Sequence, residues 1–429
     1  MKSNRLASVV AVVMLLVGCG GSDSSGGATG GSLGSVSSSD SGGTNELRIT
    51  VSNSAAYVNE PCVSVTICEP SNPSTCLTVD DVLLDTGSVG LRIFKQALAM
   101  NGGATLALKP VTVSGGAQLA ECVEYGDGSE NWGPVQTAIV GLGREPPVSM
   151  AIQVIDSSFG QSSLCGPVCG SQQESGLCVD SNPKQAGYNG ILGVGLWLQD
   201  CGASCAQAVG SSANPISYYA CQGSNCNGAE VSLANQLQNP ASLLQTDNNG
   251  VIVNLPSVDP GGATSVTGSL FFGIGTQSNN SVGSDVKFYA VDPNYGEFQT
   301  EFNGNVVPGF VDTGSQGLYF QSTLPTCVSA PGWYCVSPAA SFAATNTGIN
   351  GVSGSVSFQI GDYWTLANSG KGAFPDIGAS ASTLSSAFSS RLPFDWGLPF
   401  YLGRKVYIGI ESASLKFNQF TGTGPVVAY

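Results

Sequence analysis

The chain has 429 residues, with 29 acidic and 14 basic side chains and a formal net charge of −15 at pH 7. This acidic balance repels phosphate backbones, and no basic patch interleaved with aromatics is present, so nucleic acid is not an expected partner. The sequence contains no histidine, which excludes Ser-His-Asp and Cys-His catalysis and zinc sites that need an imidazole. Carboxylates, hydroxyls, lysines and thiols remain as candidate functional groups.

The N-terminal segment is typical of an export signal. Lys2 and Arg5 precede an uncharged run, residues 6–18, that ends at Cys19. This run is too short for a transmembrane span. A small residue before the cysteine resembles the lipobox of bacterial lipoproteins, which implies acylation of the Cys19 thiol and a membrane anchor; the alternative is an ordinary thiol in an uncleaved segment. Gly20, which is not aspartate, implies the outer membrane by the same resemblance, at its periplasmic face or the cell surface.

Residues 20–45 are nearly all Gly, Ser, Thr and Ala, so they cannot bury apolar surface and are expected to form a flexible tether. Roughly 380 residues follow. A single hydrophobic core usually supports fewer residues than this, so two lobes are expected.

The body consists of short apolar runs separated by Gly, Asn, Asp, Pro and Ser turns. This spacing predicts an all-β fold. The predicted strands are residues 47–51, 63–68, 82–84, 105–113, 136–140, 251–255, 269–274 and 286–291. Residues 379–391 are the clearest helix candidate and residues 94–100 a shorter one, so helix is a minor component.

One pattern occurs twice, an apolar strand that runs into Asp-Thr-Gly-Ser and is followed by Gly-Leu. The copies are Asp85-Thr86-Gly87-Ser88 and Asp312-Thr313-Gly314-Ser315. They lie 227 residues apart (312 minus 85), which is the period of a lobe and not of a solenoid. Two related β lobes are therefore predicted, the first over residues 46–260 and the second over residues 261–429.

The twin motifs resemble the catalytic loops of the pepsin family of aspartic peptidases, in which each lobe contributes one loop and the two aspartates meet at the lobe interface. The resemblance implies a bilobal all-β acid protease fold with Asp85 and Asp312 as the catalytic pair. Other segments match in the expected order. The flap hairpin over the substrate is matched by Tyr125-Gly126-Asp127-Gly128, and the elements beneath the two loops by residues 189–193 and 400–403. The strand between the lobes is matched by residues 268–273.

The chemistry explains these residue types. Two adjacent carboxyls cannot both ionise cheaply, so they share a proton; one acts as general base on a water and the other as general acid. Gly87 and Gly314 would allow sharp turns, while hydroxyls hold the loops in place; these are Thr86, Ser88, Thr313 and Ser315. Tyr125 would position the peptide and exclude water. The resemblance implies a polypeptide substrate, no metal or other cofactor, and a monomer.

Two positions depart from the family. At the position of Arg92, animal pepsins carry a tryptophan that supports the flap tyrosine. After residues 400–403 the family has an acidic or polar residue, whereas this chain has Arg404 and Lys405.

Fourteen cysteines minus Cys19 leave thirteen, which in an oxidising compartment favours disulfides, with one cysteine unpaired or paired elsewhere. Most lie in a cysteine-rich insertion, residues 165–226, where a four-cysteine zinc site is the alternative. Cys327 and Cys335 are expected to close a local loop.

The predicted function is that of an aspartic endopeptidase. The alternatives are a catalytically silent relative that binds peptides or proteins, and a glycoside hydrolase, which also works with two carboxylates. Tyr125 alone is also compatible with ordinary packing on a hairpin.

Overall fold

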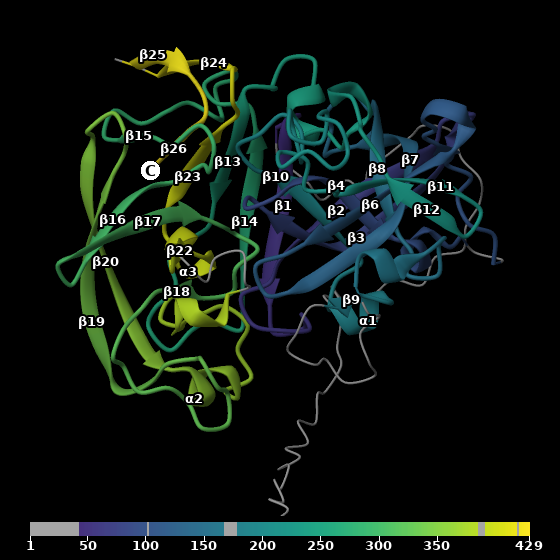
Figure 1. The fold of residues 1–429 in the computed structure, drawn as a ribbon. Helices are drawn as coiled ribbons and strands as arrows, with labels where there is room; N and C mark the ends of the chain where they lie inside the picture. The colour runs from purple at the N-terminus through teal and green to yellow at the C-terminus, as the bar shows by residue number, and fades with distance from the viewer. Residues whose placement is uncertain (1–42, 101–102, 167–177, 385–390, 418–419) are drawn as a thin grey trace, which may run out of the picture.

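The computed structural model describes residues 43–100, 103–166, 178–384, 391–417 and 420–429 (Figure 1). Cys19, the signal segment and residues 20–42 of the tether lie outside the described residues. The described chain is mostly β-sheet with few short helices, which confirms the all-β prediction. The α-helices are α1 (Pro183–Ala186), α2 (Tyr363–Ala367) and α3 (Leu398–Tyr401), and the 3-10 helices are Lys95–Leu98, Ser114–Gly116, Ser162–Leu164, Leu233–Asn235, Pro240–Leu243 and Ala381–Thr383. Within these ranges no helix has the length and apolar character needed to cross a membrane.

Six strands of the first half form a closed circuit, paired in the order β2-β3-β10-β4-β8-β7 and back to β2. Their bounds are β2 (Pro61–Glu69), β3 (Asn72–Asp85), β4 (Val89–Phe94), β7 (Ser129–Gly141), β8 (Val148–Ile155) and β10 (Gly190–Val194). Many valine, isoleucine and leucine side chains of these strands are buried in one hydrophobic core. The remaining strands of this half are β5 (Lys109–Pro110), β6 (Gln118–Glu124), β9 (Cys178–Val179), β11 (Tyr218–Gln222) and β12 (Asn225–Gly228).

A second group of strands joins the beginning, middle and end of the chain. It is antiparallel throughout, in the order β1-β14-β13-β23-β26-β15. The bounds are β1 (Glu46–Ser52), β13 (Gly250–Asn254), β14 (Ser265–Phe272), β15 (Phe288–Ala290), β23 (Lys405–Gly409) and β26 (Val426–Ala428). In Figure 1 the longer of these strands lie between the strands of the first half and those of the second-half sheet.

The second half forms a seven-stranded sheet in the order β20-β19-β16-β17-β22-β18-β21. The bounds are β16 (Phe298–Phe302), β17 (Asn305–Val311), β18 (Leu318–Tyr319), β19 (Cys335–Thr347), β20 (Ser353–Asp362), β21 (Gly378–Ala379) and β22 (Phe394–Trp396); a separate hairpin consists of β24 (Ser414–Phe417) and β25 (Phe420–Thr423). Aromatic rings pack against one another in the core of the seven-stranded half. The centroid of the Phe320 ring lies 5.0 Å from that of Phe394 and 5.1 Å from that of Phe302.

The two halves repeat one local topology around the Asp-Thr-Gly-Ser loops. The first loop connects β3 to β4, and β10 lies parallel to β3 and antiparallel to β4. The second loop connects β17 to β18, and β22 lies parallel to β17 and antiparallel to β18. Each loop therefore leaves its sheet between two strands that are held together by a third.

The structure corrects the assignment of the element beneath the second loop. Residues 189–193 do run beneath the first loop in β10, where Leu192 pairs with Leu84. The equivalent pair in the second half is Trp396 with Val311, so the counterpart is β22 followed by Gly397. Residues 400–403 instead overlap α3. The polar Asp395 interrupts the apolar pattern of β22, which is why the sequence favoured the uninterrupted apolar run farther on.

Three predicted elements also differ. Residues 379–391 do not begin as an α-helix, because Ala379 pairs with Tyr319 in β21 and only a 3-10 turn follows; residues 385–390 lie outside the described residues. Residues 94–100 contain the end of β4 and a 3-10 helix. Within residues 105–113 only Lys109–Pro110 form a strand, β5, while Thr105 and Thr112 make isolated bridges. The other seven predicted strands are confirmed.

Five disulfides confirm the prediction that the cysteines pair. They are Cys68–Cys76, Cys122–Cys165, Cys201–Cys205, Cys221–Cys226 and Cys327–Cys335. The last closes the predicted local loop, and none of the cysteines whose side chains the structure describes is free. Cys169 lies outside the described residues. These bonds indicate an oxidising environment of the kind met by exported proteins.

Candidate active site

The two Asp-Thr-Gly-Ser loops face each other, although 227 residues separate them. Asp85 is 5% exposed and Asp312 is partly buried. A Cβ atom at Gly87 would lie 2.7 Å from Asp312 Cγ, and one at Gly314 would lie 2.9 Å from Asp85 Oδ1. Each carboxyl is therefore seated against the glycine of the opposite loop, a contact that no larger residue would permit.

Each aspartate is also held by its own loop. The N–H of Gly87 donates to Asp85 Oδ1 at 2.7 Å, and the Ser88 hydroxyl donates to Asp85 Oδ2. The second loop repeats these bonds, from Gly314 N–H to Asp312 Oδ1 at 2.7 Å and from Ser315 Oγ to Asp312 Oδ2 at 2.9 Å. These donors fix the orientation of both carboxyl planes.

The threonines lock the loops to one another. Thr86 N–H donates to Thr313 Oγ1 at 3.0 Å, and Thr313 N–H donates to Thr86 Oγ1 at 3.0 Å. The Thr313 hydroxyl donates to the carbonyl oxygen of Leu84 at 2.7 Å, whereas the Thr86 hydroxyl lies 2.8 Å from the hydroxyl of Tyr401. Buried reciprocal bonds of this kind leave the relative position of the two aspartates little freedom.

The electrostatics follow from this proximity. Burial raises the pKa of Asp312 well above its usual range, and the neighbouring carboxyls of Asp85 and Asp395 raise that pKa further. Loss of the Asp312 proton beside Asp85 is therefore disfavoured, because two adjacent charges cannot both be ionised cheaply. One carboxylate beside one carboxylic acid can activate a water and protonate an oxygen in the same site.

The predicted flap residues lie on the hairpin formed by β6 and β7. The Tyr125 side chain is half-buried against an apolar cluster that includes Phe94 and Tyr188, and its hydroxyl accepts a 3.1 Å bond from Asn131 Nδ2. In the turn, Gly128 has a φ of +87° and Asp127 is exposed. This packing fits both readings of Tyr125, a flap residue and an ordinary hairpin aromatic.

Asp127 also interacts electrostatically with Tyr57 and Tyr319. Tyr57 precedes β2, in the first half, and Tyr319 belongs to β18, in the second. The turn of the hairpin is thus close to both halves of the molecule, and neither tyrosine was singled out from the sequence.

A buried charge network occupies the position where the pepsin family has tryptophan. The Arg92 side chain is 1% exposed, lies 2.6 Å from Glu121 Oε1 and 3.3 Å from Asp200 Oδ2, and donates to the Val89 carbonyl at 2.7 Å. Arg92 also interacts electrostatically with Tyr125. The hairpin tyrosine is therefore linked to a cation where a pepsin would place an indole ring.

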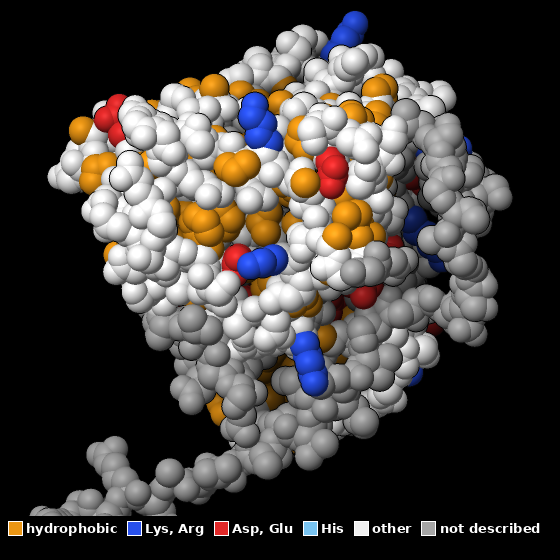
Figure 2. All heavy atoms as spheres, turned by 90° about the vertical axis from the view of Figure 1, so that its right-hand side faces the viewer, with side chains coloured by type: hydrophobic (Ala, Val, Ile, Leu, Met, Phe, Trp, Pro, Cys, Tyr) orange, Lys and Arg blue, Asp and Glu red, His pale blue; other side chains and the backbone are white. Residues whose placement is uncertain are grey.

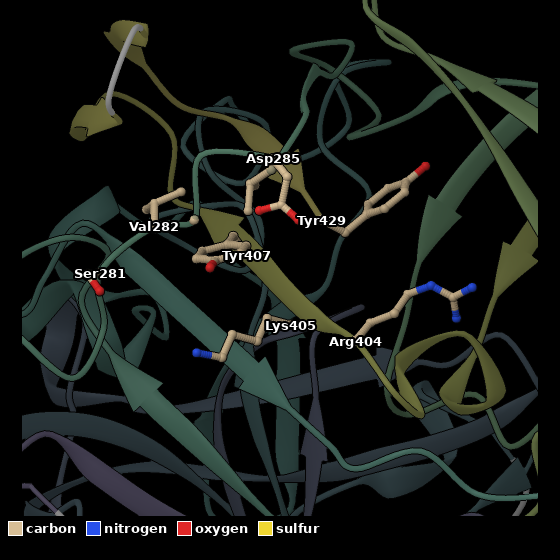
Figure 3. A pocket seen from close by; sticks show the side chains of 9 residues that line it. Ser281, Val282, Asp285, Arg404, Lys405, Tyr407 and Tyr429 are labelled. Carbon is tan, nitrogen blue, oxygen red and sulfur yellow. The ribbon is translucent and has the colours of Figure 1, made fainter.

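The basic pair Arg404 and Lys405 lies elsewhere, at a cavity of about 450 Å³ that Tyr407, Tyr429 and Asp285 help to line (Figure 3). The two cationic side chains diverge in that view and do not converge on one point. Arg404 Nη1 donates to the Phe400 carbonyl at 2.6 Å. Since the counterpart beneath the second loop is β22 followed by Gly397, the family comparison applies to Leu398, and Arg404 and Lys405 are not a departure at the aspartate loops.

The face drawn in Figure 2 carries isolated Lys, Arg, Asp and Glu side chains among uncharged ones. Its described residues present no continuous basic track of the kind that binds a phosphate backbone.

The family described as "Protein of unknown function (DUF3443)" matches residues 41–429. The chain belongs to this family. No curated protein matches the sequence. The matched region of this DUF3443 member includes both aspartate loops, the hairpin and all the described strands.

Two buried carboxyls outside the Asp85–Asp312 pair, which is called the dyad below, indicate how the free energy of unfolding depends on pH. Burial raises the pKa of Glu60 to about 8 and that of Asp180 to about 7. Both values exceed those of the unfolded chain, so the folded protein retains protons that the unfolded chain releases. This stabilisation is full below about pH 4 and is lost as pH rises through the folded pKa values.

We therefore expect the free energy of unfolding to fall by several kcal/mol between about pH 5 and pH 8, measured by urea denaturation at a series of pH values. Glu60→Gln should flatten this slope. A free energy of unfolding that rises over the same range would contradict the assignment.

Proposed function

We propose that this DUF3443 member is an aspartic endopeptidase with a bilobal, pepsin-like arrangement, its lobes spanning residues 46–260 and 261–429. The observation that carries the proposal is the seating of Asp85 and Asp312 against each other's loops, with Thr86 and Thr313 bonded across. Ordinary turn aspartates need neither reciprocal bonds nor a shared buried position. A glycoside hydrolase needs two carboxylates, yet keeps them about 5 Å or more apart to accommodate the sugar.

The reaction uses the single proton that the dyad holds. The ionised carboxyl removes a proton from a water, whose oxygen adds to the peptide carbonyl while the protonated carboxyl gives its proton to the carbonyl oxygen. The tetrahedral diol then returns a proton to the ionised carboxyl, while the protonated carboxyl gives its proton to the amide nitrogen, which leaves as the C–N bond breaks. The dyad again holds one proton. The β6–β7 hairpin would cover an extended peptide and limit access of bulk water.

The same proposal includes the location of the protein. The disulfides are in keeping with export, and the lipobox resemblance at Cys19 suggests a lipid anchor in the bacterial envelope, at the outer membrane. The peptidase would then act as a monomer on polypeptides close to that membrane.

The test is cleavage of a denatured protein mixture by the purified full chain between about pH 3 and pH 8, with and without pepstatin. We expect a bell-shaped, pepstatin-sensitive activity, because the rate requires one protonated and one ionised carboxyl. Folded protein that cleaves nothing at any pH, while binding denatured polypeptide, would replace the proposal with a peptide-binding role.

A further inference from the structure

Asp395 places a third carboxyl directly behind the dyad. It lies in β22, is 1% exposed, and stands opposite Phe310 of β17 and Tyr319 of β18. The equivalent position in the first half is Ile191 of β10, which stands opposite Leu83. The Asp312 side of the site therefore has an acid where the Asp85 side has a hydrocarbon.

A count of protons links Asp395 to the dyad. Ser315 Oγ lies 2.6 Å from Asp395 Oδ2 and 2.9 Å from Asp312 Oδ2. A serine hydroxyl has one proton and can donate to only one of these oxygens. If both carboxyls were ionised, one of the two short contacts would join two acceptors with no proton between them. One proton on either carboxyl satisfies both contacts. If Asp395 holds it, Asp395 donates to Ser315 and Ser315 donates to Asp312, whose other oxygen already accepts from the N–H of Gly314.

The surroundings of Asp395 favour the neutral acid. Its other oxygen, Oδ1, is buried and has no hydrogen-bond partner, which is costly for a charged carboxylate and tolerable for an acid. None of the ion pairs among the described residues includes Asp395. The titratable groups that face it are Asp85, Asp312, Tyr319 and Tyr401, none of which is a cation. Burial accordingly raises the pKa of Asp395.

We propose that Asp395 is a neutral positioning residue that directs the Ser315 proton to Asp312 and so sets the proton affinity of the dyad, an inference that rests on the proposed peptidase function. An oriented donor stabilises the ionised form of the carboxyl that accepts from it. The first ionisation of the dyad is therefore easier than it would be with a hydrocarbon at position 395.

The first test follows the aspartate carboxyl carbons by NMR in the full chain, labelled with ¹³C at these positions. Asp395→Asn identifies the Asp395 resonance by its loss. We expect that resonance to remain that of a protonated acid at about pH 7, whereas titration near the ordinary aspartate value of about 3.9 would overturn the proposal. This measurement needs no substrate, so an inactive wild-type protein would refute the peptidase function and still leave the state of Asp395 decided.

The second test replaces Asp395 by the residue of the equivalent position. In Asp395→Ile, Ser315 keeps Asp312 as its acceptor and loses only the bond from Asp395 that polarises its hydroxyl. We therefore expect the first apparent pKa of the dyad to rise by less than about one unit and the acidic limb of kcat to move with it, at unchanged KM. Asp395→Asn, whose amide can donate to Ser315, should restore the wild-type titration. Ser315→Ala, which removes the donor to Asp312 itself, should raise this pKa more than Asp395→Ile does, and the double variant should shift it no further than Ser315→Ala alone. A dyad that titrates as in the wild type in folded Asp395→Ile or Ser315→Ala would reduce Asp395 to a packing residue.

Discussion

Asp85→Asn and Asp312→Asn are each expected to lower kcat by about 10³-fold or more, with KM and the fold nearly unchanged. Asparagine has the size of aspartate and keeps an oxygen that can accept from the N–H of Gly87 or Gly314. It cannot exchange the proton on which the acid–base cycle depends. The measurement is the initial rate of peptide cleavage at the optimum pH of the wild type, with unfolding curves for each variant.

Asp80→Asn provides the matched control. Asp80 lies five residues before Asp85 in the same strand, is exposed, and accepts from Ser64 Oγ. The same chemical change at this position should leave the rate within about twofold, since surface substitutions away from a site usually have small effects. If Asp85→Asn or Asp312→Asn retained a rate comparable with that of the Asp80 variant, a shared-proton dyad would be refuted.

Short sequence patterns predicted much of this fold, because strands and turns depend mainly on residues that are close in the sequence. Seven of the eight predicted strands are alternating or continuous apolar runs bounded by turn residues, and the structure confirms them. The two Asp-Thr-Gly-Ser copies each specify a tight loop between strands, so one motif repeated at long range was enough to bring Asp85 and Asp312 together as candidates. Their role as catalysts stays a prediction.

What the sequence could not predict depends on pairing between distant segments. The partners of Arg92 lie 29 and 108 residues away, and neither Glu121 nor Asp200 is part of a recognisable motif. Asp395 interrupts the apolar pattern of β22. The support of the second loop was therefore predicted at residues 400–403 and not at β22. A single polar residue in an otherwise apolar strand was the one local signal for its special position.

Arg92→Ala is expected to lower the free energy of unfolding by about 3–5 kcal/mol. The Arg92 guanidinium, which is 1% exposed, lies between Glu121, also 1% exposed, and Asp200, 8% exposed. Burial and the proximity of Glu121 raise the pKa of Asp200, so the arginine chiefly offsets the Glu121 charge. Its removal leaves that carboxylate buried without a cation, and the loss of its hydrocarbon stem adds a cavity. Urea denaturation at constant pH measures the effect.

Lys95→Ala is the control, three residues along the chain. Lys95 also pairs with a carboxylate, Asp156, at 2.8 Å, but its side chain is 52% exposed. An exposed pair of this kind contributes about 1 kcal/mol or less. Adding Glu121→Gln to Arg92→Ala should recover part of the lost stability, because no uncompensated charge then remains. Equal losses in Arg92→Ala and Lys95→Ala, or no recovery in the double variant, would show that the buried Arg92–Glu121 pair does not stabilise the fold.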